Sequence, residues 1–247
     1  AKNMGIADAN GGLTGIENLT GLQKLWLDGN PGIHALRCLS NPSPLPLIEL
    51  HLNGCPQINY CGTPIRRLHC LEVLDMTGCL GRDFAPFNSL NETLYDPYCD
   101  VYLDKLEKLY LSGCENLSTC GINVLAYLPG LEYVDLSNCS GIDSLDCLIG
   151  NPNFGDDGGS EDTIDITGLS FTGLDDDIDC LCAKGVKVKN GSTANVCTGG
   201  ETCETHVTSC RSACPDHRFH TTCTGGEMED CSAPEGEYVC DVETVCD

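Results

Sequence analysis

Apolar side chains recur at fixed positions within short segments along this chain. Five segments share the pattern apolar-x-x-apolar-x-apolar-x-x-Asn/Cys, and they begin at Leu22, Leu47, Leu71, Leu106 and Leu131. Successive segments begin 25, 24, 35 and 25 residues apart. Alternating apolar and polar positions are typical of a strand with one buried face. Repetition at this period predicts a solenoid, in which each unit buries its apolar face only against its neighbours.

These repeats resemble those of the leucine-rich repeat family. The resemblance rests on several matched positions that recur in register, and it covers residues 22 to about 170. It implies an α/β-type solenoid, a horseshoe with a parallel β-sheet on its concave face. A sixth strand is predicted in the segment that runs from Thr163 to Leu169.

The sequence divides into three predicted regions. Residues 1–21 are an N-terminal capping segment, residues 22–179 are the solenoid, and residues 180–247 are a small, disulfide-rich and loop-rich C-terminal module or tail. Within the solenoid we expect an insertion at about 81–104 and an acidic loop at about 150–162. Insertions of this kind project from a solenoid and often supply specificity.

Alternation along each predicted strand places the residues between the leucines on the concave face. We expect three columns there, of which the last contains Asp28, Asn53, Thr77, Ser112, Ser137 and Thr167. The first contains Lys24, Glu49, Val73, Lys108, Tyr133 and Thr163. The second contains Trp26, His51, Asp75, Tyr110, Asp135 and Asp165. Because interfaces favour rigid aromatic side chains, the predicted binding residues are Trp26, His51, Asp75, Tyr110, Tyr133 and Asp135. The alternative interpretation is that these are solvated residues that suit a sheet.

Twenty cysteines, about 8% of the chain, predict an oxidising, extracellular location. The chain begins at Ala1 without a leader pattern, so we expect a mature form. Four cysteines replace the usual Asn after the strand, where the family resemblance implies a buried thiol: Cys55, Cys79, Cys114 and Cys139. The oxidising compartment nevertheless favours disulfides for most cysteines. The disulfide candidates are Cys38, Cys55, Cys61, Cys70, Cys79, Cys99, Cys114, Cys120, Cys139, Cys147, Cys180, Cys182, Cys197, Cys203, Cys210, Cys214, Cys223, Cys231, Cys240 and Cys246.

One segment of the C-terminal region permits a zinc interpretation. Cys214, His217, His220 and Cys223 are a legitimate tetrahedral zinc set. Four ligands within ten residues are, however, closer together than structural zinc sites usually place them, and further cysteines flank them. Disulfides are therefore the favoured interpretation here, with the two histidines at the surface.

The net charge of −24 comes from 13 Lys and Arg against 37 Asp and Glu. Such a surface repels nucleic acid and favours cations or basic partners. Acidic residues interleaved with Gly and Asn could hold calcium, and the candidates are Asp156, Asp157, Asp162, Asp175, Asp176 and Asp177. No complete EF-hand spacing is present, so a solvated acidic loop is the favoured alternative, and no other cofactor is expected.

The sequence offers little support for catalysis or membrane insertion. It has no G-x-S-x-G elbow, P-loop or H-E-x-x-H motif, so we expect a protein that is not an enzyme. No apolar run approaches the roughly 20 residues of a membrane span. Sequons predict candidate glycosylation sites at Asn18, Asn91, Asn116, Asn138 and Asn190.

Two non-enzymatic functions fit these features. The first is an extracellular structural protein that self-associates head to tail into a filament or surface assembly, because the N-terminal end has no cysteine before Cys38 to build a disulfide cap. The second is a monomeric secreted or cell-surface recognition or adhesion module that binds protein or glycan on its concave face. The dense cysteine content and the N-terminal end without a disulfide cap favour the first hypothesis, and the recognition module is the alternative.

Overall fold

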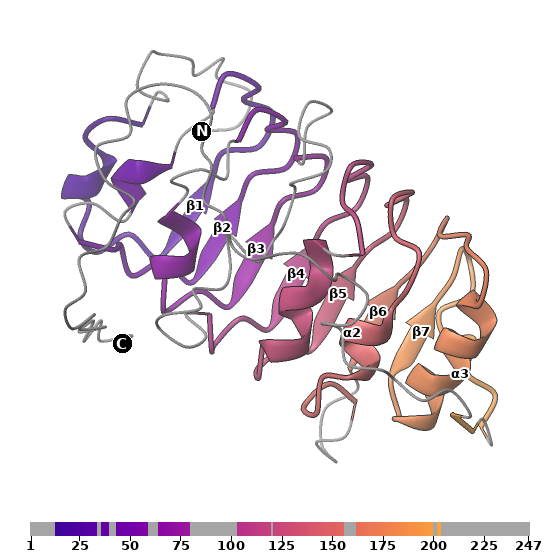
Figure 1. Cartoon of the computed structure of the whole chain (residues 1–247). Helices are drawn as coiled ribbons and strands as arrows, with labels where there is room; N and C mark the ends of the chain where they lie inside the picture. The colour runs from indigo at the N-terminus through magenta and orange to yellow at the C-terminus, as the bar shows by residue number, and fades with distance from the viewer. Residues whose placement is uncertain are drawn as a thin grey trace, which may run out of the picture.

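A parallel sheet of seven strands runs through the protein, with β1 to β7 side by side in chain order (Figure 1). The computed structural model describes residues 13–33, 36–39, 43–58, 64–79, 103–119, 121–155, 162–199 and 202–203. The strands are β1 (Lys24–Trp26), β2 (Glu49–His51), β3 (Val73–Asp75), β4 (Lys108–Tyr110), β5 (Tyr133–Asp135), β6 (Thr163–Asp165) and β7 (Lys187–Lys189). The predicted solenoid fold is confirmed. The predicted insertion lies almost entirely outside the described residues.

Neighbouring strands pair in the register that the repeats predict. Leu25 lies opposite Leu50, and Leu50 lies opposite Leu74. Leu74 lies opposite Leu109, so the longer spacing between these two repeats does not shift the register. Strand β7 pairs with β6 but has no counterpart among the predicted strands, and it lies beyond the predicted end of the solenoid at residue 179.

Short helical segments lie across the core from the sheet (Figure 1). They are η1 (Ile16–Asn18), η2 (Arg37–Leu39), η3 (Pro64–Arg67), η4 (Gly121–Tyr127), α2 (Asp146–Ile149) and α3 (Leu174–Ala183). Leu50, Leu74 and Leu109 point inward from the strands and are fully buried, as are Ile122 and Leu148 from the helical layer. Because each strand is only three residues long, this continuous apolar core supplies the stability that a single repeat lacks.

A tight turn follows the strands and needs a left-handed residue. In five repeats this residue is a glycine, with φ between 64° and 81°: Gly29, Gly54, Gly78, Gly113 and Gly168. Asn138 holds the same place after β5, with φ 59°. Asn is one of the few residues with a side chain that tolerate this conformation, which explains why the glycine is replaceable here.

The cysteines that follow these turns form a column of buried thiols. Each thiol donates a hydrogen bond to a carbonyl oxygen of the preceding repeat: Cys55 to Leu27 (3.2 Å), Cys79 to Leu52 (2.9 Å), Cys114 to Met76 (3.4 Å) and Cys139 to Leu111 (3.1 Å). In the first repeat the side-chain amide of Asn30 donates to the Leu27 carbonyl at 2.7 Å. The Asn30 bond lies within one repeat, whereas the cysteine thiols link adjacent repeats.

The predicted disulfides are wrong for six cysteines of the solenoid. Cys38, Cys55, Cys79, Cys114, Cys139 and Cys147 are thiols. In the strand-end column the thiols point at carbonyl oxygens, and Cys147 likewise donates to Asn123 Oδ1 at 2.8 Å. Cys70 is disulfide-bonded. Nine other candidates lie outside the described residues: Cys61, Cys99, Cys120, Cys210, Cys214, Cys223, Cys231, Cys240 and Cys246.

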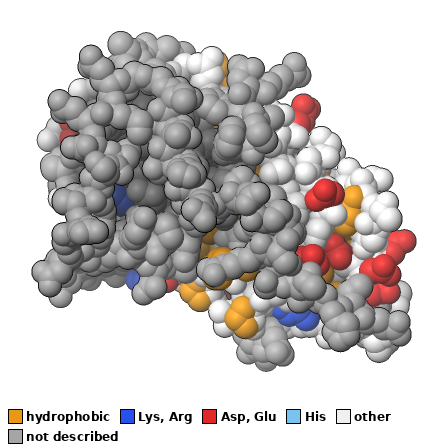
Figure 2. Space-filling model, viewed as in Figure 1, with side chains coloured by type: hydrophobic (Ala, Val, Ile, Leu, Met, Phe, Trp, Pro, Cys, Tyr) orange, Lys and Arg blue, Asp and Glu red, His pale blue; other side chains and the backbone are white. Residues whose placement is uncertain are grey.

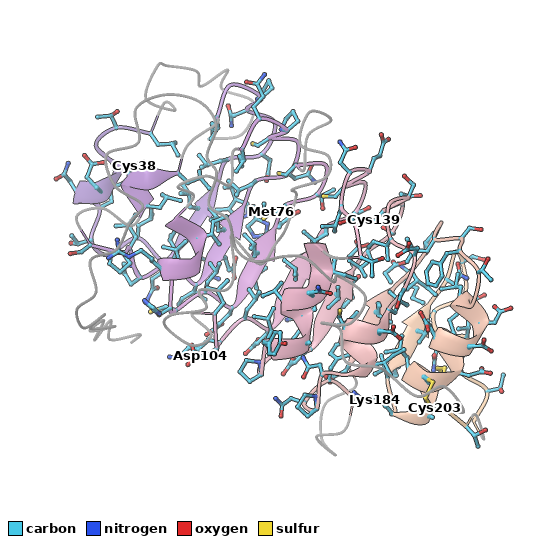
Figure 3. All side chains as sticks on the ribbon, in the orientation of Figure 1. Cys38, Met76, Asp104, Cys139, Lys184 and Cys203 are labelled. Atoms are coloured by element: carbon cyan, nitrogen blue, oxygen red, sulfur yellow. A yellow bond between two sulfur atoms is a disulfide. The ribbon has the colours of Figure 1, made fainter. Side chains whose placement is uncertain are left out.

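The C-terminal end of the sheet is covered by the chain itself. The Val196 amide donates to the Val188 carbonyl at 2.8 Å, and Asn195 Oδ1 accepts from the Val188 amide at 3.2 Å. Two disulfides, Cys180–Cys203 and Cys182–Cys197, tie this segment to α3 (Figure 3). They agree with the predicted disulfide-rich C-terminal region. The outer edge of β7 is therefore not open for pairing with another strand.

One buried carboxylate links the last two helices. Asp177 of α3 accepts a hydrogen bond from the Leu145 amide, which precedes α2, at 2.8 Å from Oδ2. Burial raises the pKa of Asp177 to about 6, and the nearby Asp146 and Asp176 add to this effect, while the Leu145 hydrogen bond opposes it.

On the face seen in Figure 2, acidic side chains gather toward the end of the molecule that carries α3.

The thiol column predicts a specific labelling pattern. Burial raises the pKa of Cys55, raises that of Cys79 well above its usual value, and raises that of Cys139 to about 12. Since the thiolate is the reactive form, we expect these residues to resist iodoacetamide at pH 8 in the native protein and to react in denaturant. Peptide mass spectrometry measures both states. Finding these positions joined in disulfides in the native protein would contradict the prediction.

The raised pKa of Asp177 predicts that the native chain and an Asp177→Asn variant differ in stability in a way that depends on pH. Because its pKa is raised above the usual 3.8, the native protein binds more protons than the unfolded chain between about pH 4 and pH 6. The protonated carboxyl therefore stabilises the native protein at low pH. The free energy of unfolding falls as the pH rises through that window, because this stabilisation is lost. We expect Asp177→Asn to match the native chain near pH 4 and to exceed its stability at pH 7.

Urea unfolding at several pH values measures this difference. Asp175→Asn is the matched control, because Asp175 is exposed in the same helical turn and is not among the charges that raise the pKa of Asp177. A stability gain for Asp177→Asn that is the same at pH 4 and pH 7 would show that the ionisation of Asp177 is not its cause.

Candidate binding surface

The sheet face opposite the helical segments, which we call the concave face, carries the residues that the sequence assigns to binding. In each of β1 to β5 the middle residue is buried and its two neighbours are at least partly exposed. Register pairing places Trp26 beside His51, His51 beside Asp75, and Tyr110 beside Asp135. The predicted columns are therefore present, with neighbouring strands about 4.8 Å apart.

An aromatic pair and three charged groups occupy the N-terminal part of the concave face. The rings of Trp26 and His51 are stacked, with centroids 5.4 Å apart and planes 9° from parallel. Trp26 keeps 37% of its surface exposed. His51 lies between Glu49, 3.8 Å from its Nε2, and Asp75, 3.5 Å from its Nδ1. Lys24 Nζ contacts Glu49 at 2.6 Å, and this hydrogen bond is the main reason why the pKa of Glu49 is lowered.

A second aromatic pair lies on β4 and β5. The ring centroids of Tyr110 and Tyr133 are 5.1 Å apart and their planes are tilted by 39°. Burial raises the pKa of Tyr133 to about 12, and the charges of Asp135 and Asp165 add to this shift. The phenol therefore stays neutral at physiological pH and lies in a region of negative potential.

Three aspartates of the second column also stabilise the strand ends. Asp75, Asp135 and Asp165 each accept a hydrogen bond from the amide two residues later, at 3.0, 2.9 and 3.0 Å. This local bond orients each side chain, as it does in other Asx turns. The interpretation of these residues as merely solvated missed this contribution, although the Asp-x-[Ser/Thr] spacing of all three could have indicated it.

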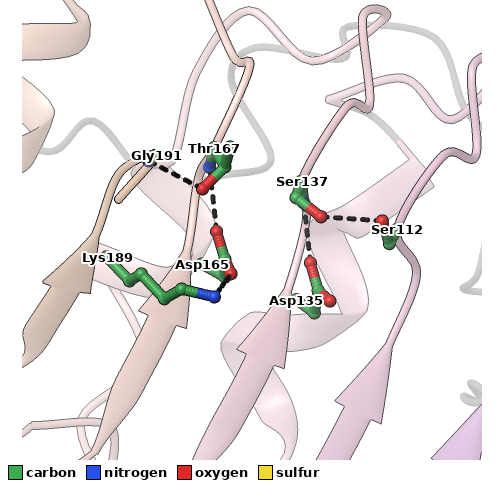
Figure 4. A network of polar contacts seen from close by, with 7 residues as sticks. All are labelled: Ser112, Asp135, Ser137, Asp165, Thr167, Lys189 and Gly191. Carbon is green, nitrogen blue, oxygen red and sulfur yellow. Dashed lines mark hydrogen bonds and ion pairs between the residues drawn. The ribbon is translucent and has the colours of Figure 1, made fainter. Parts of the chain in front are cut away.

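Polar contacts continue into the last strands of the concave face (Figure 4). Lys189 of β7 forms an ion pair with Asp165 Oδ2, and Ser137 and Ser112 are joined through their hydroxyls at 2.7 Å. Burial alone would raise the pKa of Asp165, but hydrogen bonds from Lys189 and Thr167 lower it. Sequence analysis missed Lys189, because the only signal was the short alternation Lys187-Val188-Lys189 outside the repeat pattern.

The calcium candidates are not gathered into one site within the described residues. Asp162 Oδ2 accepts from the Gly155 amide at 2.6 Å, whereas Asp177 Oδ2 accepts from the Leu145 amide. Asp175 and Asp176 are exposed in the first turn of α3. No group of three or more potential metal-ligating side chains occurs in the part of the chain that the structure describes. Asp156 and Asp157 lie outside it, as does the zinc candidate segment.

The predicted glycosylation sites differ in accessibility. In Asn116 the side-chain nitrogen that would carry a glycan is buried, which argues against its modification in the folded chain. Asn18 and Asn138 are exposed and Asn190 is half-buried, so these three stay predictions. Asn91 lies outside the described residues. Among the helices that are described, none has the length and apolar character that a membrane crossing requires.

Comparisons with known proteins give limited but consistent likenesses. No family model matches the chain. A segment of 105 residues, 42% of the chain, is 30% identical to Disease resistance protein RML1A of Arabidopsis thaliana, but it spans only 9% of that protein.

Solved structures with the same kind of repeat are also similar. Internalin C2 of Listeria monocytogenes superposes with a TM-score of 0.50 at 19% identity, over 82% of this chain and 76% of the internalin. A leucine-rich repeat protein of Leptospira interrogans gives a TM-score of 0.37 at 18% identity, over 71% of this chain and 50% of that one. The repeats, the register of the seven strands and the likeness to internalin C2 lead to one conclusion: this chain has the fold of a leucine-rich repeat solenoid.

Proposed function

We propose that this protein is a non-catalytic, extracellular interaction module that recognises a polypeptide partner on its concave face. The observation that carries the proposal is the presence of two aromatic pairs, Trp26 with His51 and Tyr110 with Tyr133, on that face. Aromatic side chains bury a large area at small cost in conformational entropy, which is why they dominate binding interfaces.

The position of these pairs supports the proposal further. Each aromatic residue lies on a strand whose middle residue is buried, so the sheet fixes its direction before any partner arrives. A surface that is ordered in advance loses less entropy on binding. The net charge of −24 adds attraction for a basic partner, and the two C-terminal disulfides are in keeping with an oxidising compartment.

The first test of this function is a binding screen of the full chain against an array of secreted and cell-surface proteins. For the partners found, we expect Trp26→Ala combined with Tyr110→Ala to weaken binding roughly tenfold or more, since exposed aromatic residues are typical hot spots. Surface plasmon resonance measures the change. Tyr127→Ala is the control, because Tyr127 is 38% exposed on η4, across the core from the concave face.

Two results would overturn the assignment of the face. One is a partner that binds the double variant as tightly as the native chain. The other is a partner that loses affinity only with Tyr127→Ala, which would place the contact on the helical side.

Self-association into a filament is the second candidate function, and one observation favours it. Leu19, next to η1 in the first described repeat, is 52% exposed, the most exposed large apolar side chain among the described residues. An apolar contact at this end could join a second copy. The covered edge of β7 means that such an assembly would use side chains of the C-terminal region rather than strand pairing.

The filament hypothesis predicts a response to a charge at this position. Leu19→Lys should reduce the assembled fraction several-fold, because a buried unpaired charge opposes association. Negative-stain electron microscopy and sedimentation velocity at several concentrations measure assembly, with Leu19→Met as the conservative control. Discrete monomers for the native chain at all concentrations would reject the filament and leave the recognition module standing.

A further inference from the structure

The carboxylates of the concave face differ in their contacts with basic groups. Four carboxylates project from the strands: Glu49, Asp75, Asp135 and Asp165. Lys24 contacts Glu49, and His51 contacts Asp75. Asp135 and Asp165 lie opposite each other on β5 and β6, and Lys189 forms its ion pair with Asp165. Within the described residues Asp135 therefore has no ion pair of its own, and Lys108, which lies opposite Tyr133 on β4, forms none with it.

Asp135 has one carboxylate oxygen engaged and the other available. Its Oδ1 accepts the Ser137 amide at 2.9 Å. For its Oδ2, the described residues provide neither a hydrogen bond nor an ion pair. The Ser137 bond orients the carboxylate, and the side chain is partly exposed. A charged group approaching the concave face thus meets a fixed carboxylate oxygen.

Two tyrosines are neighbours of Asp135 on the concave face. Tyr110 is the register partner of Asp135 on β4, and Tyr133 precedes Asp135 by two residues on the same face of β5. Both rings are partly exposed and lie next to each other. An aromatic ring face attracts a cation through its quadrupole, and it also packs against the methylene groups of a long basic side chain. A carboxylate beside two such rings is suited to a cation carried on an aliphatic stem.

On the neighbouring strand β6, Asp165 has a similar arrangement in which a lysine already contacts the second carboxylate oxygen. Asp165 accepts the Thr167 amide through Oδ1 and contacts Lys189 Nζ through Oδ2 (Figure 4). Asp135 repeats the first half of this arrangement with Ser137 but has no lysine of its own on Oδ2. The intramolecular pair therefore shows which group the second oxygen can receive.

From these observations we infer that Asp135, Tyr110 and Tyr133 form a seat for the ammonium group of a lysine supplied by the polypeptide partner. The inference rests on the proposed function and specifies its chemistry. Lysine fits better than arginine because one oxygen is already bound to a backbone amide, whereas a guanidinium is favoured where both oxygens are available for a bidentate contact.

The test uses the full chain and a small probe, Nα-acetyl-lysine N-methylamide, in an NMR titration at low salt, where exposed charges are screened least. We expect saturable shifts of the Ser137 amide and of the Tyr110 and Tyr133 ring protons. The matching norleucine compound, which lacks the charge, should leave the Ser137 amide unshifted. A response to the arginine compound equal to or stronger than that to lysine would overturn the assignment of lysine.

Substitutions then show which carboxylate causes the response to the lysine probe. Asp135→Asn keeps an oxygen for the Ser137 amide but removes the negative charge, and it should reduce the shift at Ser137 about fivefold. Lys189→Gln should strengthen the response, because it removes the lysine that contacts Asp165, next to Asp135. Asp28→Asn is the matched control, since Asp28 Oδ1 also accepts a backbone amide, from Asn53, in another repeat. An equal response in Asp135→Asn and the native chain would overturn the seat.

The result of the lysine titration can be told apart from the result of the partner-binding test. If lysine causes no shift at Ser137 while array partners still depend on Trp26 and Tyr110, the seat is wrong and concave-face recognition stands. If lysine shifts Ser137 but no partner depends on the concave face, the seat is present and the proposed function is wrong.

Discussion

The in-register pairing of parallel strands from successive repeats is the constraint on which this structure depends. Each strand has three residues and a single buried side chain in the middle, so no repeat can bury its apolar surface alone. Pairing fixes the apolar residues in one continuous core. It also fixes the outward residues in columns at the strand spacing, so the geometry of the candidate surface follows from the packing of the core.

Contacts between repeats outside the sheet reinforce this register. The thiols after the turns bond to carbonyl oxygens one repeat earlier, whereas Asn30 at the same position bonds to the Leu27 carbonyl of its own repeat. A thiol is a weak donor, but it is small, apolar and well suited to a buried position. Cysteine at these positions is therefore a packing residue, in contrast to Cys180 and Cys182, which are crosslinked to the segment that covers β7.

The two ends of the stack differ in a way that bears on function. At the C-terminal end, hydrogen bonds from residues 195 and 196 cover β7, and disulfides hold this cover to α3. At the other end Leu19 presents apolar surface to solvent. The concave face between them carries ordered aromatic and charged groups. A module of this form offers its most specific chemistry along the sheet, which is why recognition is favoured over assembly through the ends.

Much of the candidate surface was predictable because side-chain direction in a strand follows from local alternation. Trp26, His51, Asp75, Tyr110, Tyr133 and Asp135 all lie on the expected face. Their partners were not predictable. The link between Asp177 and the Leu145 amide, and the ion pair of Lys189 with Asp165, join residues 32 and 24 positions apart. Neither follows from a periodic pattern.

The sequence by itself determined the repeat, the strands β1 to β6 and their register, because a spacing of apolar residues acts within one strand and its neighbours. Only the tertiary structure decided the oxidation state of the solenoid cysteines, the extra strand β7 and the roles of the individual carboxylates. These depend on which groups meet across repeats. A cysteine becomes a disulfide or a buried thiol according to what lies within a few ångströms of its sulfur, and composition carries no information about that distance.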